Sequence, residues 1–148
     1  MNKNPLLGTW KMKSYVVTTA AGERSTPYGH NPQGYLSYSA DGRMQAIVAA
    51  SSREVPAAAS ATDSERVALY NTMFAYAGTY SVEGGKVVHH VDISWNEAWT
   101  GTDQTRFFEL NGDTLRFTAR IPDPVTGEER HYAVVWEKVA SPTPYRGT

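Results

Sequence analysis

The sequence of 148 residues contains no cysteine. This absence excludes disulfide bonds, thiolate nucleophiles, zinc–thiolate sites and iron–sulfur clusters together, and it is compatible with a reducing compartment. An excess of charge of one sign is also missing, since 14 basic residues stand against 15 acidic residues and no basic run occurs. A nucleic acid or an anionic membrane would be attracted by a basic surface patch. We therefore expect neither as a partner.

Long hydrophobic runs are missing as well. No apolar stretch approaches the roughly 20 residues that a transmembrane helix needs, and residues 1–10 lack the apolar segment of a secretion signal. We therefore expect a soluble, cytoplasmic protein. The length fits a single domain with a sizeable core. We expect this domain to span residues 1–140 and the proline-containing residues 141–148 to form a flexible tail.

Alternating apolar and polar residues predict eight β-strands, most of them joined by short turns with glycine at Gly42, Gly84 and Gly112. The predicted strands cover residues 6–18, 35–39, 43–49, 79–83, 86–95, 104–110, 114–120 and 130–139. Strands joined in this way form an antiparallel meander, and closing eight of them into a barrel removes unpaired edges. The prediction is an all-β, mostly antiparallel barrel whose interior can hold one small ligand.

The first predicted strand has two distinct faces. Gly8, Trp10, Met12, Ser14 and Val16 share one face, and the other carries Thr9, Lys11, Lys13, Tyr15 and Val17. Since the lysines belong in solvent, the face of Trp10 is predicted to point inward and that of Tyr15 outward.

Residues 19–34 lack the strand pattern. They hold three glycines and two prolines without periodicity, and a loop of this length is typical of a lid over an opening. Whether it moves stays open.

One helix is predicted, over residues 63–77. Thr62 and Glu65 form a capping box before it, and Gly78 is suited to end it. Its apolar residues recur at spacings of three and four, and they are Val67, Tyr70, Met73, Phe74 and Ala77. We expect this helix to flank or plug one end of the barrel and to pack its apolar stripe on the sheet.

Ordered motifs through nearly the whole chain resemble bacterial and fungal lipocalin-like domains. They are Leu7-Gly8-Thr9-Trp10, similar to the lipocalin Gly-x-Trp signature, then Pro32-x-Gly34-Tyr35-Leu36-x-Tyr38, Ala75-Tyr76-Ala77-Gly78-x-Tyr80, His89-His90-Val91, Trp99-x-Gly101-Thr102-x-Gln104-x-Arg106 and Leu110-x-Gly112-Asp113-x-Leu115. The C-terminal arginine that seals the tryptophan in many secreted lipocalins has no clear equivalent in this sequence, although Lys138 lies near its place. The resemblance implies a lipocalin-like barrel with an internal pocket but no particular activity.

The strand at residues 86–95 is the strongest functional lead. Successive side chains face opposite sides, so one of His89 and His90 faces inward. If the apolar face looks inward, the lumen receives Val87, His89, Val91, Ile93 and Trp95, whereas His90, Asp92 and Ser94 face outward or lie under the helix. A buried neutral imidazole can act as a general base or satisfy a polar neighbour. In the inverse arrangement His90 and Asp92 would form a base oriented by a carboxylate, and the choice stays open.

The neighbouring strand places Arg106 on the face of Phe108 and Leu110. If that face looks inward, the guanidinium must be paired or must await an anionic oxygen, because an isolated buried charge costs several kcal/mol. The alternative is a side chain at the barrel mouth that reaches solvent.

Two functions follow from a lipocalin-like interior. One is a binding or carrier protein for a small apolar or aromatic ligand, of polyketide or terpenoid type, and the other is a cofactor-free cyclase or isomerase of natural-product biosynthesis. In the catalytic hypothesis His89 moves a proton and Arg106, with Tyr38 or Tyr132, stabilises an oxyanion. The residues expected to hold the ligand are Trp10, Met12, Leu36, Met44, Tyr80, Val91, Trp95, Trp99, Phe108, Phe117 and Val134.

No cofactor and no protein metal site is predicted, because His89 and His90 cannot both reach one ion from a regular strand. A haem held by His89 or His131 is a minor option. The identity of the ligand stays open, and so does the oligomeric state, which includes a homodimer.

Overall fold

The structure is a computed structural model, and it describes residues 4–123 and 125–140. The predicted flexible tail at residues 141–148 lies outside the described residues. The elements are β1 (Gly8–Thr19), β2 (Arg24–Ser25), β3 (Gln33–Tyr38), β4 (Arg43–Ala49), α1 (Asp63–Asn71), β5 (Met73–Glu83), β6 (Lys86–Ser94), η1 (Glu97–Trp99), β7 (Asp103–Asn111), β8 (Thr114–Pro122) and β9 (Glu129–Lys138).

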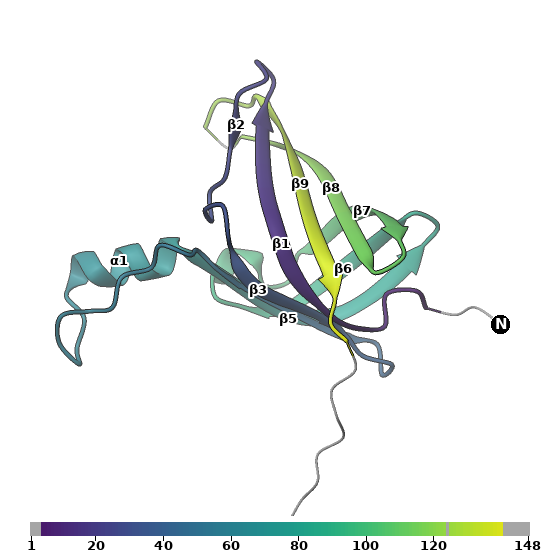
Figure 1. The fold of residues 1–148 in the computed structure, drawn as a ribbon, viewed down its shortest axis with the longest axis horizontal. Helices are drawn as coiled ribbons and strands as arrows, with labels where there is room; N and C mark the ends of the chain where they lie inside the picture. Colours follow the sequence, from purple (N-terminus) through teal and green to yellow (C-terminus); the bar gives the residue numbers. More distant parts are fainter. Residues whose placement is uncertain (1–3, 124, 141–148) are drawn as a thin grey trace, which may run out of the picture.

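Eight of the strands form a closed antiparallel barrel (Figure 1). They pair in the order β1-β3-β4-β5-β6-β7-β8-β9, and β9 returns to pair with β1 from Trp10 opposite Lys138 to Thr19 opposite Arg130. The two residues of β2 add a short ladder to the other edge of β1. The predicted eight-stranded barrel is confirmed, and each predicted strand corresponds to one strand of the barrel.

The helix α1 is shorter than the sequence pattern indicates. It begins with the predicted capping box, in which the Thr62 hydroxyl accepts from the Glu65 amide and the Glu65 carboxylate accepts from the Thr62 amide. It ends at Asn71, however, and the expected second half of the helix is the start of β5. Gly78 is therefore not a helix cap but an interior residue of a strand. Pairing of β5 with both β4 and β6 outweighs the local spacing of three and four.

The helix flanks the barrel and does not enter it. Figure 1 shows α1 projecting from the connection between β4 and β5, and none of its residues is buried. Val67 and Tyr70 are largely exposed, and although the Tyr70 ring lies 6.3 Å from that of Trp95, the helix does not bury the predicted apolar stripe on the sheet. Among the described residues, no helix has the length and apolar character to cross a membrane.

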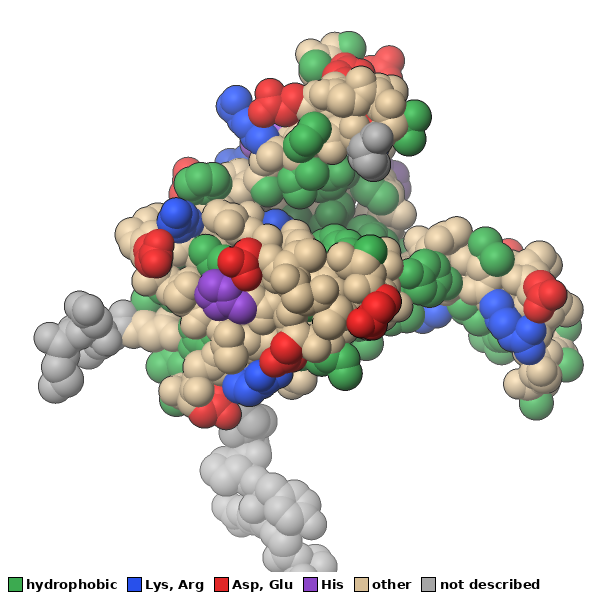
Figure 2. All heavy atoms as spheres, turned by 180° about the vertical axis from the view of Figure 1, so that it is seen from behind, with side chains coloured by type: hydrophobic (Ala, Val, Ile, Leu, Met, Phe, Trp, Pro, Cys, Tyr) green, Lys and Arg blue, Asp and Glu red, His purple; other side chains and the backbone are tan. Residues whose placement is uncertain are grey.

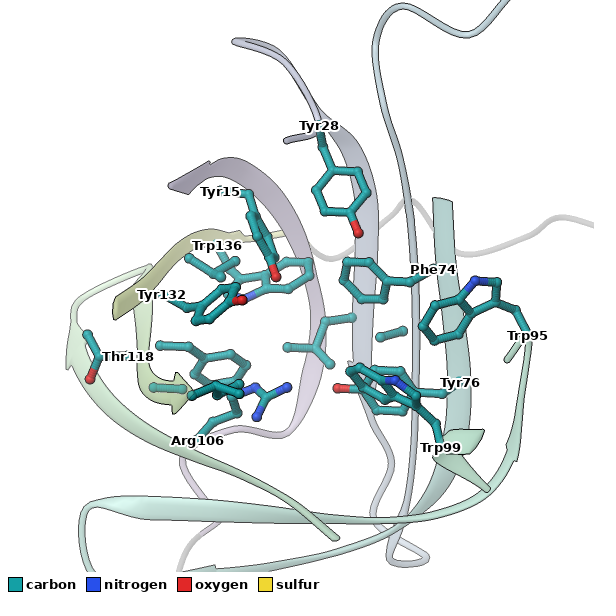
Figure 3. Close-up of a pocket in the computed structure, with 16 residues that line it drawn as sticks. Tyr15, Tyr28, Phe74, Tyr76, Trp95, Trp99, Arg106, Thr118, Tyr132 and Trp136 are labelled. Carbon is teal, nitrogen blue, oxygen red and sulfur yellow. The ribbon is translucent and has the colours of Figure 1, made fainter. Parts of the chain in front are cut away.

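A β-bulge in β1 reverses the predicted faces of its second half. The pairing of β1 with β9 shifts between Met12 and Ser14. A bulge inserts one extra residue, so the inward and outward positions exchange beyond it. Val17 is buried and Tyr15 points into the interior, as Figure 3 shows, which corrects the prediction that both face outward.

A second bulge lies in β6, opposite β5. Gly78 pairs with Val91 and Ala77 pairs with Ile93, so one residue of β6 is left over. Ile93 is 63% exposed, and its predicted inward position is wrong. Gly78 fits this place because a Cβ atom there would collide with the carbonyl oxygen of His90.

The interior of the barrel consists of a filled half and an open half. The filled half lies around the first part of β1, where Trp10 is 2% exposed and its Nε1 donates to the carbonyl oxygen of Leu6 at 2.9 Å. The Lys138 ammonium lies 4.8 Å from the centre of the Trp10 ring. Lys138 thus covers the Trp10 ring, close to the place that the sequence comparison indicates for the sealing residue. The open half lies at the other ends of these strands and contains a cavity.

Candidate functional site

A cavity of about 210 Å³ occupies the open half of the barrel (Figure 3). Its wall is mainly aromatic, with Tyr15, Tyr28, Phe74, Tyr76, Trp95, Trp99, Phe117, Tyr132 and Trp136. The other lining residues are Leu36, Ala46, Arg106, Thr118, Ala119, Ile121 and Val134. Figure 2 shows a recess with hydrophobic side chains between the body of the molecule and its upper lobe, where the β8–β9 connection lies in Figure 1. A concave apolar wall with few polar groups is typical of a small-molecule site.

Aromatic rings follow one another along one side of the cavity. Tyr15 contacts Tyr132 and Tyr28, with ring centres 6.2 and 4.9 Å apart. Tyr28 contacts Phe74 at 5.5 Å, and Phe74 contacts Trp95 at 6.1 Å. Edge-to-face and tilted contacts of this kind fix the rings against each other and leave flat surfaces for a further ring.

The segment predicted as a lid contributes to the cavity wall. Tyr28 belongs to the loop between β2 and β3, and its ring lies over Phe74 and beside Tyr15. The loop is tied to the β4–α1 connection by a hydrogen bond from the Ser51 amide to the Tyr28 carbonyl, at 3.4 Å. The loop therefore lies at the cavity, and its movement as a lid stays a prediction.

Arg106 brings a positive charge to the cavity wall. In β7 the neighbouring Thr105 and Phe107 are exposed, so Arg106 points to the interior, but it is only half-buried and combines features of both alternatives. Its Nη1 donates to the carbonyl oxygen of Thr105 at 3.0 Å. No ion pair joins Arg106 to a carboxylate of the described residues, and Figure 3 shows its guanidinium inside the cavity.

His89 lies between two tyrosine hydroxyls in the barrel interior. Its Nε2 is 2.6 Å from the Tyr38 hydroxyl and its Nδ1 is 2.8 Å from the Tyr76 hydroxyl. The side chain is 1% exposed. Burial, followed by the charge of Arg106 and then that of His90, lowers the pKa of His89 to about 3. The imidazole is therefore neutral at ordinary pH, and it donates one hydrogen bond and accepts the other.

The two neighbouring histidines have different environments, as strand alternation predicts. His89 is the inward histidine, whereas His90 lies on the outer face with its Nδ1 2.8 Å from Asp103 and its Nε2 3.1 Å from Ser81. The alternative pairing of His90 with Asp92 is wrong, because Asp92 forms a two-pronged ion pair with Arg43 at 2.7 and 3.0 Å.

The structure separates the predicted site residues into two groups. Those that line the cavity are Leu36, Trp95, Trp99, Arg106, Phe117, Tyr132 and Val134. Those that do not line it are Trp10, Met12, Tyr38, Met44, Tyr80, His89, Val91 and Phe108, which pack in or against the core of the filled half. The predicted catalytic residues are accordingly split. Arg106 and Tyr132 face the cavity directly, whereas His89 is connected to it through the hydroxyl of Tyr76.

Several cavity residues escape prediction from the sequence. Tyr15 is turned inward by the bulge in β1, and Phe74 and Tyr76 lie in the segment that was assigned to the helix. Alternation in residues 74–80, with an aromatic residue or glycine at every second position, is the signal that could have identified this strand.

The side chains that could bind metal do not gather at the cavity. Among residues 4–123 and 125–140, no three His, Asp or Glu side chains are close enough to hold one ion. A haem ligand would have to face the cavity, but both ring nitrogens of His89 are hydrogen-bonded and neither His89 nor His131 lines the wall. The residues present do not fit the haem option.

Comparison with known proteins relates the chain to a protein family and to a fungal carrier protein. A family model described as a lipocalin-like domain matches residues 7–139. A 4'-hydroxy-3'-methoxypropiophenone carrier protein of Aspergillus oryzae is 28% identical over 88 residues, which is 54% of this chain and 79% of the carrier protein. Both matches support the binding of a small hydrophobic ligand.

Proposed function

The chain belongs to the lipocalin-like domain family, and from this premise we propose that it binds and carries a small aromatic molecule in its barrel. The observation that carries the proposal is the cavity of about 210 Å³ with its aromatic wall. An apolar ring that leaves water for such a wall gains free energy in proportion to the area it buries.

The size of the cavity narrows the ligand to a molecule with one substituted ring. A protein cavity of about 150 Å³ is large enough for benzene, so about 210 Å³ leaves room for a ring with a short side chain. The similar carrier protein of Aspergillus oryzae is named for a propiophenone, which has one ring. A polycyclic polyketide or terpenoid would have to extend out of the cavity.

Catalysis as a cyclase or isomerase has less support than binding. An acid–base enzyme needs a group that reaches the substrate and has a pKa near the working pH. His89 reaches the cavity only through the Tyr76 hydroxyl, and its pKa of about 3 makes it a weak base. Arg106 and the tyrosines can stabilise an oxyanion, but they can equally hold a ligand.

The test is equilibrium binding of 4'-hydroxy-3'-methoxypropiophenone and of unsubstituted propiophenone, followed by tryptophan fluorescence and by calorimetry. Trp95, Trp99 and Trp136 line the cavity, so a bound ring should change the emission. We expect saturable binding with a stoichiometry of one. If neither compound shows saturable binding, the proposal is wrong.

A matched pair of variants locates the binding. Ala119 lines the cavity, whereas Ala133 lies on the outer face of the adjacent β9. Ala119→Leu fills part of the cavity and should weaken binding about tenfold or more, which is a loss of about 1.4 kcal/mol or more. Ala133→Leu makes the same change outside and should alter binding little. Equal effects of the two substitutions would place the ligand elsewhere.

A further inference from the structure

The charge inside the barrel is not balanced by the described residues. Among the described residues, the buried acidic, basic or histidine side chains are His89 and Asp123. His89 is neutral, and Asp123 forms an ion pair with Arg130 outside the cavity lining. Arg106 therefore adds a positive charge to the cavity wall, and no carboxylate of the described residues forms an ion pair with it.

The guanidinium of Arg106 and the indole N–H of Trp136 are polar groups of the cavity wall that can only donate hydrogen bonds. Arg106 presents a guanidinium, which has donors and no acceptor. The indole nitrogen of Trp136 is buried at the cavity wall and has no hydrogen-bond partner among the described residues. Burial raises the pKa of Tyr15, so its hydroxyl keeps its proton and can donate or accept, whereas the Tyr76 hydroxyl is already paired with His89 Nδ1. Among the described residues the Trp136 N–H has no hydrogen-bond partner and the Arg106 guanidinium has no carboxylate partner, and an acceptor on the ligand can meet both requirements.

The guanidinium lies where a ligand in the cavity would meet it. Its charge lowers the pKa of His89 and opposes the raised pKa values of Tyr15, Tyr38 and Tyr76. These four side chains come from β6, β1, β3 and β5, so the charge is close to several walls of the barrel at once. Figure 3 shows the guanidinium between Tyr132 on one side and Tyr76 on the other.

The barrel wall beside Arg106 explains how a charge without an ion-pair partner among the described residues is tolerated before a ligand binds. The ladder between β7 and β8 ends where Phe107 is opposite Thr118. Residues 103–106 therefore continue in pairing with β6 alone. Arg106 is consequently half-buried and keeps part of its contact with solvent.

We infer that the ligand carries an anionic oxygen, either a carboxylate or a phenolate, which binds to Arg106 while its aromatic ring packs on the cavity wall. The inference rests on the proposed function and specifies the class of its ligand. A guanidinium and a carboxylate can form two parallel charge-assisted hydrogen bonds, which are stronger than neutral ones. A phenolate oxygen offers the same negative charge in a single atom.

The experiment compares ligands of nearly equal shape and different charge. The first pair is 4-hydroxy-3-methoxybenzoate and 4-hydroxy-3-methoxybenzamide at neutral pH, where the carboxylate is ionised and the amide is neutral. The second pair is 4'-hydroxy-3'-methoxypropiophenone and its methyl ether, in buffer alkaline enough to ionise the phenol. In at least one pair we expect the anion to bind about tenfold or more tightly than its neutral counterpart. The pair that shows the preference identifies carboxylate or phenolate as the bound group.

The same pairs are then measured with substituted proteins. Arg106→Met removes the charge and should reduce the preference for the anion to about twofold or less, while Arg106→Lys should retain part of it. Arg120→Met removes the same charge from an exposed position on β8 and should leave the preference intact. Circular dichroism checks that each variant is folded, and the preference of the unsubstituted protein tests the inference even if the Arg106 variants fail to fold.

The possible results separate this inference from the proposed function. If none of the probes binds, the proposed function fails and the inference fails with it. If anion and neutral compound bind equally in both pairs, aromatic binding stands and the inference is wrong. A preference that survives Arg106→Met in a folded protein would refute the assignment to Arg106.

Discussion

Both halves of the barrel interior contain a tryptophan and a basic residue, but the described residues match these groups more completely in one half than in the other. In the filled half, the indole nitrogen of Trp10 donates to the backbone and Lys138 lies over its ring. In the open half, the indole nitrogen of Trp136 has no partner among the described residues, and Arg106 forms no ion pair with them. A native interior normally satisfies its buried polar groups. The unsatisfied half is therefore the better candidate for a binding site.

The tyrosine–histidine cluster illustrates the same difference. Tyr38 and Tyr76 use both ring nitrogens of His89, so this titratable group is fully engaged by the protein. Sequence reasoning selects His89 first because a buried histidine is commonly functional. Its contacts support a structural role, and Tyr76 is the member of the cluster that reaches the cavity.

The largest expected effect comes from breaking this cluster. His89→Ala leaves two buried hydroxyls without their partner and opens space in a packed core, so the free energy of unfolding should fall by about 3–5 kcal/mol. His90→Ala, on the outer face of the same strand, removes partly exposed contacts with Asp103 and Ser81 and should cost about 1 kcal/mol or less. Urea denaturation of both variants measures the difference. Similar losses of unfolding free energy for the two variants would contradict the structural role of the buried His89 cluster.

The pH dependence of stability should show a somewhat smaller effect. The pKa of His89 is about 3 in the folded protein, against an ordinary value of 6.5. Below pH 6.5 the unfolded chain takes up a proton at this residue and the folded protein does not, so stability is fully present above pH 6.5 and falls with decreasing pH until about pH 3. At about pH 4.5 the loss from this residue should be about 2–3 kcal/mol.

His89→Gln isolates this contribution, because glutamine can donate and accept hydrogen bonds but does not titrate. The free energy of unfolding of the variant should fall less between neutral and acid pH than that of the unsubstituted protein. Parallel curves for the two proteins would show that His89 does not change its protonation between the folded and unfolded states.

Much of the fold could be read from the sequence because its signals are local. The glycine turns at Gly84 and Gly112 and the alternation between them determine which strands pair, and the structure follows them. The two β-bulges could not be predicted in this way, since a bulge depends on the register between strands that are distant in the sequence. A register shift of one residue is enough to move the Tyr15 side chain from the outer face of the barrel to the cavity.

The candidate site was predictable only in part for the same reason. Arg106 follows from strict alternation in β7, where the structure has no bulge in the pairings with β6 and β8. The inward position of Tyr76 could not be predicted, because residues 67–77 have the apolar spacing of a helix. Pairing of β5 with β4 and β6 outweighs that spacing in the structure. No local sequence pattern predicts the division into a filled and an open half, because the same apolar residue types occur in a packed core and in a cavity wall.

Substitution of Arg106 should have the smallest effect on stability, although it should have the largest effect on the preference for an anionic ligand. Arg106 has no carboxylate partner among the described residues, so Arg106→Met removes no ion pair and relieves the cost of holding a half-buried charge. The free energy of unfolding without ligand should stay the same or rise by up to about 1 kcal/mol. Arg120→Met serves as the control for the change in net charge and should stay within about 0.5 kcal/mol of the unsubstituted protein. A loss above about 2 kcal/mol for Arg106→Met alone would show that the guanidinium supports the fold, and the contrast between the two halves would then not extend to their charged residues.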